Sequence, residues 1–283
     1  MATVAGLLDD ATARIAAALG LDKREARLEA RTLAAFAWNV SPAWLIAHDT
    51  DPLTDAQSAQ FQTLLTRRLV GEPVAYLTGT REFYGRPFRV SPDVLIPRPD
   101  TELLVELALE RMPPDQAMDV LDLGTGSGCI ALTLALERPL ARVTAVDRSA
   151  AALVIARHNA DMLNASVEFL TSDWFAALGG RRFDLIVGNP PYIAAADPHL
   201  ARGDVRFEPL SALAAGDDGL DDLRRLAVAA CAHLRPGGTL LLEHGHDQAD
   251  AVQALLRKNG IRHPRSWADL AGIRRVSGGE LSE

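Results

Sequence analysis

The stretch VLDLGTGSGCIAL, residues 120–132, decides the fold of this chain. Its first part is an apolar run typical of a buried strand, and the residues after the last glycine have the composition of a helix. Gly124, Gly126 and Gly128 lie between the two, and glycine permits both a tight turn and the close approach of a ligand to the backbone. The stretch therefore predicts a strand, a ligand-binding turn and a helix in succession.

Strand-like and helical segments alternate from this stretch onward. The strand-like runs are residues 118–124, 141–147, 166–170, 183–189 and 238–245, and helical segments begin at Ser127 and Ser149 and recur near 217–234 and 246–259. This alternation predicts an α/β fold in which a parallel sheet has helices on both faces. Right-handed crossovers make the sheet doubly wound and Rossmann-like, and ligands then bind beyond the carboxyl ends of its strands. The last residues, IRRVSGGELSE, leave the edge strand unassigned.

The first 75 residues are rich in Ala, Leu, Arg and Glu, with apolar positions at helical spacing. Ser41 before Pro42 has the pattern of an N-cap and a first helical residue. Thr54 followed three residues later by Gln57 has the pattern of a capping box. The segment therefore predicts a small helical bundle, closed by a glycine and a proline at 71 and 73.

Residues 76–99 predict a β-hairpin linker between the bundle and the α/β domain, which we place at 100–283. Apolar residues flank Gly85-Arg86-Pro87, which predicts the hairpin turn at these three residues. The segment LIPRPDTE follows, and Asp100 or Thr101 is expected to cap a helix that runs to about Arg111.

Composition and charge restrict the classes of protein. The chain has 283 residues and a formal net charge of −8, whereas a protein that binds nucleic acid through phosphates usually has a basic balance or stripe. No basic leader or apolar run long enough to span a bilayer is present in the sequence. Cys129 and Cys231 lie in apolar contexts and are expected to be buried free thiols. We therefore expect a soluble, cytoplasmic protein with no membrane contact and no direct contact with nucleic acid. We also expect a monomer, although no sequence pattern indicates the oligomeric state.

The glycine turn and the following strand together predict a nucleoside site. Asp147 ends the next strand about 20 residues after the turn, where a carboxylate can accept hydrogen bonds from both hydroxyls of a ribose. The spacing is GxGxG rather than GxGxxG, Asp122 precedes the turn, and no lysine suits a phosphate-binding loop. A positively charged sulfonium, as in S-adenosylmethionine, fits this acid-flanked turn better than a pyrophosphate. Helix–strand packing at the turn and an N-cap role for Asp147 are the structural alternatives.

Two further polar or aromatic segments follow strands of the predicted sheet. Trp174, in SDWF, follows the third strand and can pack on adenine while Asp173 contacts the adenine amine; the alternative for Trp174 is a core position. The second of these segments lies in IVGNPPYIAA, where Asn189, Pro190, Pro191 and Tyr192 directly follow the fourth strand.

Asn189 to Tyr192 form a corner of hydrogen-bond acceptors beside the predicted methyl donor. An amide or amino nitrogen is a poor nucleophile because its lone pair is delocalised. The Asn189 side-chain oxygen and the Pro190 carbonyl can each accept one N–H of an incoming NH₂ group, which positions the nitrogen for reaction. Pro191 keeps the turn rigid, and the Tyr192 ring offers a face that favours positive charge. The alternative is a turn that only ends a strand.

In order, IPRPDTE, DLGTGSGCIAL, VD, SDWF, NPPYI, GDVRFEP and LLLEHG closely resemble the motifs of the release-factor glutamine methyltransferases, the HemK-type protein-(glutamine-N5) methyltransferases. The resemblance covers nearly the whole chain. It implies a class I methyltransferase fold, S-adenosylmethionine as cofactor, and methylation of the glutamine in the Gly-Gly-Gln loop of peptide chain release factors. It also implies that the cofactor contacts Gly124, Thr125, Gly126, Ser127, Gly128, Asp147, Trp174 and Asn189. The catalytic corner, Asn189 to Tyr192, then holds the glutamine amide, and the helical bundle recognises the protein substrate.

The remaining motif residues keep two interpretations each. Arg98 and Glu102 either line the methionine end of the cofactor or form a capping ion pair. Arg206 and Glu208 belong either to a substrate-side loop or to a salt-bridged turn. Glu243, His244 and His246 lie around the last predicted parallel strand, where a structural role for Glu243 is at least as strong a hypothesis as a functional one. The two histidines lack a set of metal-ligand partners, so no metal site is predicted.

Two other functions compete with this interpretation. NPPY is shared with nucleic-acid methyltransferases that act on adenine N6 or guanine N2, which take a flipped base into the corner. The net charge of −8 argues against that alternative, and a continuous basic face on the bundle would favour it. A non-catalytic cofactor-binding scaffold is the second alternative, and the intact Asn189 and glycine turn argue against it.

Overall fold

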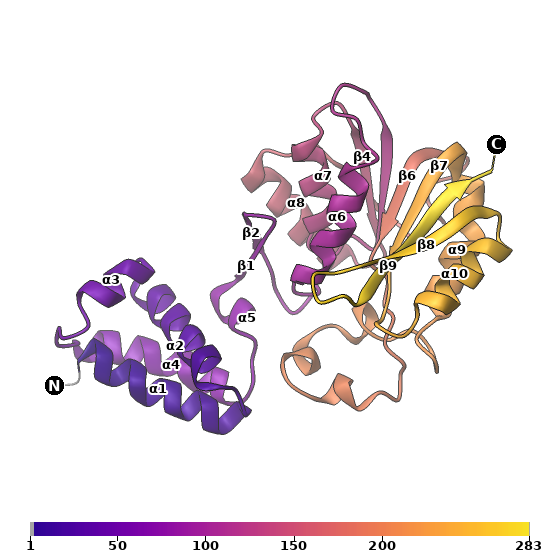
Figure 1. The fold of residues 1–283 in the computed structure, drawn as a ribbon. Helices are drawn as coiled ribbons and strands as arrows, with labels where there is room; N and C mark the ends of the chain where they lie inside the picture. Colours follow the sequence, from indigo (N-terminus) through magenta and orange to yellow (C-terminus); the bar gives the residue numbers. More distant parts are fainter. Residues whose placement is uncertain (1–2, 283) are drawn as a thin grey trace. The chain divides into compact units, whose positions relative to one another are not determined.

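The computed structural model describes residues 3–282, which fold into two compact units (Figure 1). The first unit runs to Thr80 and includes the segment Ala201–Phe207. The second unit comprises Arg81–Leu200 and the residues from Glu208 onward. Each unit has its own apolar core, so each is described by itself.

The first unit is the predicted helical bundle. Its helices are α1 (Val4–Leu19), α2 (Lys23–Trp38), α3 (Pro42–Ala47), α4 (Asp55–Leu69) and α5 (Val74–Thr78). Ser41 accepts a hydrogen bond from the backbone of Trp44, and Thr54 forms the predicted capping box with Gln57, so both helix starts are confirmed. The short helix α5 is not predicted by the sequence, because the proline before it has the pattern of a stop signal.

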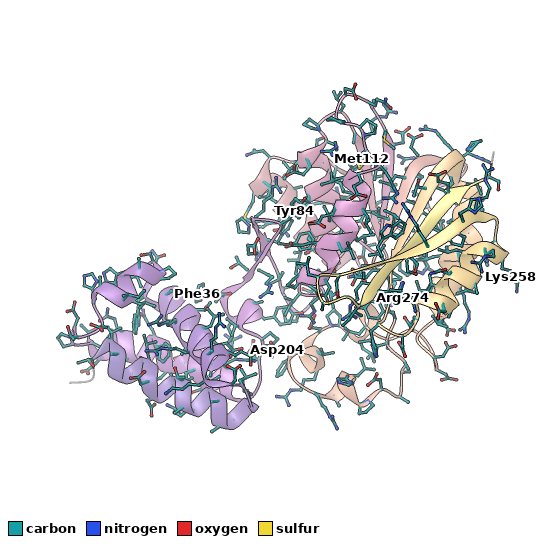
Figure 2. All side chains as sticks on the ribbon, viewed as in Figure 1. Phe36, Tyr84, Met112, Asp204, Lys258 and Arg274 are labelled. Carbon is teal, nitrogen blue, oxygen red and sulfur yellow. The ribbon has the colours of Figure 1, made fainter. Side chains whose placement is uncertain are left out.

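The predicted hairpin is present: β1 (Thr80–Phe83) pairs with β2 (Arg86–Arg89), and from Arg81 onward it belongs to the second unit. The turn lies at Tyr84 and Gly85, which have φ values of 52° and 73°; Tyr84 is labelled in Figure 2. The predicted turn at Gly85-Arg86-Pro87 is therefore wrong by about one residue, since Arg86 already belongs to the second strand. A two-residue turn with positive φ at both positions matches the twist of a hairpin, which favours this register.

The segment after the hairpin differs from the prediction in its helix cap. A single 3₁₀ turn (η1, Pro99–Thr101) leads directly into α6 (Glu102–Leu109). Thr101 has helical dihedral angles of −68° and −18°, and neither Asp100 nor Thr101 makes a side-chain cap. An N-cap residue normally has extended dihedral angles, so the helical conformation of Thr101 directs its hydroxyl elsewhere.

The second unit is built on a seven-stranded sheet in the order β5-β4-β3-β6-β7-β9-β8. The strands are β3 (Asp119–Leu123), β4 (Arg142–Asp147), β5 (Glu168–Thr171), β6 (Phe183–Gly188), β7 (Leu234–Glu243), β8 (Ile261–Ala268) and β9 (Arg274–Leu281). The first five strands in that order are parallel, as predicted, and β9 runs antiparallel to both of its neighbours. The sequence did not predict β8 or assign β9.

Helices cover both faces of this sheet (Figure 1). The helices α6, α7 (Cys129–Glu137) and α8 (Ala150–Leu163) pack on one face, and α9 (Asp221–His233) and α10 (Ala249–Lys258) pack on the other. Val120 of β3 belongs to the core of the first face, and Leu121 and Leu123 belong to that of the second. This alternation along one strand is what burial on both faces requires. The doubly wound α/β fold is therefore confirmed.

The two cysteines are both free thiols, but they differ in burial. Cys129 is buried, as predicted, whereas Cys231 is only half-buried, because it lies near the end of α9 with its Sγ 2.6 Å from the carbonyl oxygen of Asn259. Between residues 3 and 282, the structure contains no helix that combines the length and apolar character needed to cross a membrane.

Candidate functional site

The glycine turn connects β3 to α7 at the carboxyl edge of the sheet. Gly124, Gly126 and Gly128 have φ values of 71°, 54° and 83°, a region that residues with a Cβ rarely adopt. The backbone N–H groups of Gly124 and Thr125 both donate to the carbonyl of Val146, at 2.9 Å each. These bonds fix the turn against the end of the neighbouring strand β4.

Asp147 ends β4 and faces the same turn. Its Oδ2 accepts a hydrogen bond from the Gly126 N–H at 2.9 Å, and its Oδ1 accepts one from the Ser149 N–H at 2.8 Å. An ionised carboxylate has about four acceptor sites, so each oxygen can still accept one further bond. Two such acceptors side by side match the two hydroxyls of a ribose.

A cavity lies over this turn, entirely within the second unit. Predicted residues that line it are Gly124, Gly126, Asp147, Trp174, Asn189 and Pro191; apolar side chains such as Val94, Leu95 and Ala152 complete its wall. A cavity with convergent polar groups and an apolar wall is what a nucleoside-bearing cofactor requires.

Trp174 follows β5 and forms one wall of the cavity. Its ring approaches the glycine turn so closely that a Cβ on Gly124 would lie 3.1 Å from a ring carbon. Its Nε1 donates to Asp222 at 3.0 Å, and its own φ is 51°, an unusual value for a bulky residue. The neighbouring Asp173 is exposed and pairs with Arg225 at 2.8 Å.

Three other predicted cofactor residues belong to the turn but are not among the residues that line the cavity. Thr125 and Ser127 are buried, and Thr125 donates its hydroxyl to Asp122 Oδ2 at 2.6 Å. A Cβ on Gly128 would lie 3.0 Å from Leu132, so this glycine is required for packing of the helix. Asp122 is fully buried, and burial raises its pKa to about 7. Its carboxyl therefore holds the turn residue Thr125, and Asp122 is not among the residues that line the cavity.

The corner formed by Asn189 to Tyr192 follows β6, which neighbours β3 as predicted. Asn189 lines the cavity, and its Nδ2 donates to the Thr101 hydroxyl at 3.2 Å. With its NH₂ group engaged in this way, the side-chain oxygen of Asn189 remains as an acceptor. Pro190 and Pro191 are both buried, which holds the backbone of the corner in place.

Tyr192 connects the corner to the end of β7. Its hydroxyl donates to Glu243 Oε1 at 3.4 Å, and its backbone carbonyl accepts from Gln248 Nε2 at 3.0 Å. Glu243 is 1% exposed, and burial raises its pKa to about 7, while the hydroxyls of Thr101 and Tyr192 act in the opposite direction. Burial also raises the pKa of the Tyr192 hydroxyl, so this group stays protonated.

The structure decides in part between the two roles predicted for each of the charged motif residues Arg98, Glu102, Arg206 and Glu208. Arg98 pairs with Glu208, whose carboxylate also accepts from the Ile96 N–H at 3.0 Å, and Glu102 accepts from the Tyr84 N–H at 2.9 Å. The pairing of Arg98 with Glu102 is therefore not formed. Arg206 donates to the carbonyl of Val70 within the first unit, so Arg206 and Glu208 belong to different units.

His244 has a structural environment. The side chain is buried, and its two ring nitrogens contact the carbonyl of Gly245 at 2.8 Å and the hydroxyl of Ser277 at 2.7 Å. His246 is exposed, and its Nδ1 lies 4.0 Å from Asp247 Oδ1.

Thr101 and Glu243 are the residues that the sequence did not place at the site. Its pattern favours a helix cap for Thr101 and a structural role for Glu243. The signal for Glu243 is its position, because an acid directly after a buried parallel strand lies at the ligand-binding edge of the sheet. Thr101 gives no comparable signal, because its role depends on a contact 88 residues away in sequence.

Two family models match the chain. The "Methyltransferase small domain" matches residues 100–203, and the "PrmC N-terminal domain" matches residues 7–79. These ranges contain the glycine turn and the corner in one case and most of the helical bundle in the other.

Curated relatives are similar over most of their length. A release factor glutamine methyltransferase from Bordetella pertussis is 57% identical, with 90% of this chain and 95% of the relative covered. One from Burkholderia pseudomallei is 52% identical, with 90% and 92% covered. Among solved structures, a 16S rRNA N2 methyltransferase from T. thermophilus in complex with AdoMet and guanosine has a TM-score of 0.54 and 26% identity, covering 71% of this chain and 49% of the other.

The residues around the cavity fit the cofactor that these comparisons indicate. Asp147 has acceptor sites that suit ribose hydroxyls, the glycine turn has open space beside Gly126, and the ring of Trp174 forms an aromatic wall of the cavity. The protein is a methyltransferase, and its cofactor is S-adenosylmethionine. Similarity to named relatives over nine-tenths of the chain completes the assignment: the chain belongs to the release factor glutamine methyltransferase family.

Proposed function

We propose that this enzyme methylates the side-chain amide nitrogen, N5, of the glutamine in the Gly-Gly-Gln loop of peptide chain release factors. The observation that carries the proposal is the orientation of Asn189. Its NH₂ group is engaged by Thr101 and its side chain lines the cofactor cavity, which leaves an amide oxygen to accept an N–H from a substrate. The names of the curated relatives support the same substrate class.

The cofactor is held by the second unit alone in this proposal. Asp147 binds the ribose hydroxyls, Trp174 packs on the adenine side, and Gly124 and Gly126 allow the close approach of the cofactor to the backbone. Thr125, Ser127 and Gly128 complete the turn, and Asn189 lies at the reacting end. When bound, S-adenosylmethionine supplies a sulfonium methyl group that is transferred to a nucleophilic nitrogen, which loses one proton, while the cofactor becomes a thioether.

The corner residues orient the amide nitrogen for this reaction. The Asn189 side-chain oxygen and the Pro190 carbonyl each accept one N–H of the glutamine NH₂ group, and Pro191 fixes the distance between these two acceptors. The Tyr192 ring packs against the planar amide. Positioning of a reacting group in this way contributes several kcal/mol to lowering the barrier, on the order of the values for oriented intramolecular reactions. A strong base is not required, because the amide nitrogen carries a positive charge once it has gained the methyl group and then releases a proton to water.

We also propose that the helical bundle, residues 1–75, recognises the body of the release factor. The corner alone contacts only an NH₂ group, so specificity for one protein must come from another surface. On α2, Leu28 and Phe36 are 69% and 50% exposed, and Figure 2 labels Phe36. Exposed apolar side chains contribute to affinity when a partner removes them from water.

Methylation of an exocyclic amine of a nucleic acid is the second candidate. The rRNA methyltransferase of similar fold, solved with guanosine, favours it, since a base amine is also an NH₂ group. The charges of the bundle do not decide between the two substrates. Arg14, Arg27, Arg67 and Arg68 are each paired with an acid of the same unit, whereas the ion pairs of the described residues include none for Lys23, Arg24 and Arg31 of α2. The names of the curated relatives favour the protein substrate.

The deciding experiment offers both substrate classes to the same enzyme. The chain is incubated with labelled S-adenosylmethionine and a release factor, total tRNA, rRNA or DNA, and peptide mass spectrometry locates the methyl group. We expect label on the Gly-Gly-Gln glutamine and none on a release factor in which that glutamine is replaced by glutamate. Label on nucleic acid and none on the release factor would refute the proposal.

The proposed substrate also implies where and in which form the enzyme works. Release factors act in translation, so we infer a cytoplasmic enzyme, and since the cofactor cavity is built by one chain we infer a monomer. Light scattering of the purified chain, coupled to size-exclusion chromatography, measures the mass directly. A mass near 30.4 kDa supports the monomer, and twice that value contradicts it.

A further inference from the structure

The orientation of the Asn189 amide needs a cause beyond Asn189 itself. An asparagine side chain can rotate by half a turn and exchange its oxygen for its NH₂ group with almost no change in shape. In the wrong orientation, the corner would present N–H donors to a substrate NH₂ group. The contact between Asn189 Nδ2 and Thr101 Oγ1, at 3.2 Å, selects one orientation only if the Thr101 hydroxyl acts as an acceptor.

A hydroxyl accepts reliably when its own hydrogen is directed to another group. Thr101 is 3% exposed, so bulk water does not supply that partner. Glu243 is 1% exposed, and within residues 3–282 its Oε2 has no hydrogen-bond partner, whereas Oε1 already receives the Tyr192 hydroxyl. The Thr101 hydroxyl lowers the pKa of this carboxyl. A hydrogen bond from Thr101 to Oε2 would give both buried groups a partner.

The sheet register explains why Glu243 lies beside the corner. Gly188 of β6 pairs with Leu242 of β7 in parallel register. The next residue on each strand is Asn189 in one case and Glu243 in the other, so both emerge at the same edge. Thr101 lies in η1, beside this edge. Its backbone is helical and its hydroxyl does not cap α6, so the hydroxyl is available to Asn189.

We propose that Thr101 and Glu243 form a positioning relay for the methyl transfer: Glu243 accepts the Thr101 hydrogen, Thr101 accepts the Asn189 NH₂ group, and the Asn189 oxygen is thereby directed at the substrate. The relay rests on the proposed function, because it gives Asn189 the acceptor role that an NH₂ substrate requires. Thr101 and Glu243 are positioning residues in this scheme, since each acts through another side chain.

The charge of Glu243 controls the relay. An ionised carboxylate only accepts, whereas a protonated one can donate to Thr101 Oγ1 and compete with Asn189. The titratable and polar groups that act on Glu243 are Tyr192, Asp100 and Thr101 around the corner, Arg275 on β9 and Cys129 on α7. Because burial raises the pKa of Glu243 to about 7, the relay is complete above that pH and is lost as the pH falls through it.

The first test removes the Thr101 hydroxyl. Thr101→Val keeps the shape, and Thr101→Ser restores the hydroxyl, so the serine variant serves as the rescue. We expect Thr101→Val to lower the single-turnover rate at saturating cofactor by about tenfold, the equivalent of one lost hydrogen bond, with cofactor affinity unchanged. The matched control is Thr133→Val, a fully buried threonine whose hydroxyl bonds within its own helix, and it should keep the wild-type rate.

A double-mutant cycle separates positioning from general stability. If Thr101 acts through Asn189, Thr101→Val should lower the rate of the wild-type enzyme and have no further effect in the Asn189→Ala background. Equal losses in both backgrounds, or a wild-type rate in Thr101→Val, would overturn the relay. Glu243→Gln provides a second variant, which should flatten the rise in rate near pH 7 that the wild-type enzyme is expected to have.

A measurement without substrate keeps the relay testable if the proposed function fails. The side-chain NH₂ signal of Asn189 is assigned in a ¹⁵N–¹H spectrum by its loss in Asn189→Ala. In the wild-type chain this signal should shift with an inflection near pH 7, and Glu243→Gln should abolish the shift. If the chemical shift of this signal does not change with pH, or changes equally in Glu243→Gln, the relay is overturned. A wild-type enzyme that leaves the release-factor glutamine unmethylated overturns the proposed function, while this spectrum still decides the relay.

Discussion

Asn189 Nδ2 donates to Thr101 Oγ1 at 3.2 Å, which joins the end of β6 to the turn before α6 across 88 residues of sequence. In the proposed function this contact leaves the oxygen of the Asn189 amide available at the cofactor cavity. An oxygen directed at an incoming NH₂ group suits a glutamine side chain, and an NH₂ group directed there would not. The chemical role of the corner therefore depends on a residue outside the corner.

The ribose site is tested at Asp147. Asp147→Ala removes the acceptors that we assign to the ribose hydroxyls, and bonds to a charged group contribute roughly 1.5–3 kcal/mol each. We expect the Kd for S-adenosylmethionine, measured by calorimetry, to rise on the order of 10²- to 10⁴-fold if both bonds are lost. The matched control is Asp250→Ala, an exposed aspartate paired with Arg274, which should leave the Kd unchanged. Undiminished affinity in Asp147→Ala would remove this residue from the ribose site.

The close approach at the glycine turn is tested by adding one methyl group. Gly124→Ala places a Cβ at φ 71° and 3.1 Å from the Trp174 ring, whereas Gly272→Ala places one at φ 80° with nothing within 4 Å. Both variants should lose about 1–2 kcal/mol of unfolding free energy from the left-handed backbone. Only Gly124→Ala should also weaken cofactor binding, because it displaces the ring. Equal cofactor affinity in the two variants would mean that the turn has no close contact with the cofactor.

Local signals in the sequence are sufficient to predict much of this fold. The capping box at Thr54 and Gln57 and the helix start at Ser149 are predictable because each depends on residues within one helical turn. The strand, turn and helix around Gly126 are predictable for the same reason, since apolar runs and glycines act within a short window. The parallel sheet follows from the alternation of element types.

Local sequence signals do not predict contacts between residues that are far apart in the chain. Thr101 matches a helix cap locally, but its hydroxyl bonds Asn189, so tertiary structure overrides local propensity. The strand β8 is missed because His263 and Pro264 interrupt an already polar segment, and its pairing with β9 is what makes it a strand. Asp122 is expected beside the ligand, whereas its burial depends on the helix packed above it.

Burial of Glu243 predicts a dependence of stability on pH. Its pKa is raised from 4.5 to about 7, so its contribution is fully present below about pH 4.5 and is lost as the pH rises through 7. Glu243→Gln should therefore reduce the fall in unfolding free energy between about pH 5 and about pH 8 by on the order of 2–3 kcal/mol. Urea unfolding of both proteins at the two pH values measures this. Part of the fall should persist in the variant, because Asp122 also has a pKa raised to about 7. If the unfolding free energy fell by the same amount in both proteins, Glu243 would not be a buried carboxyl with a raised pKa.

Recognition by the bundle predicts a separate kinetic effect. Replacing Leu28 and Phe36 of α2 by serine removes two exposed apolar side chains from the proposed recognition surface. We expect KM for the release factor to rise about tenfold, with kcat and cofactor affinity unchanged. The lost contacts stabilise the bound substrate and the transition state equally, so their removal weakens binding alone. Leu270→Ser, a fully exposed leucine of the second unit, is the matched control. A KM that stays at the wild-type value in the α2 variant would exclude this face of the bundle.

The most direct test of the central claim is the single-turnover rate of methyl transfer to the release-factor glutamine by Asn189 variants at saturating cofactor. Asn189→Ala removes the acceptor and should lower the rate on the order of 10²–10³-fold, as for one oriented hydrogen bond at a reacting centre. Asn189→Asp keeps an acceptor but loses the donor to Thr101, and its rate should lie between those of Asn189→Ala and the wild type. A wild-type rate in Asn189→Ala would show that the corner only ends a strand and would contradict the role of Asn189 in orienting the substrate amide.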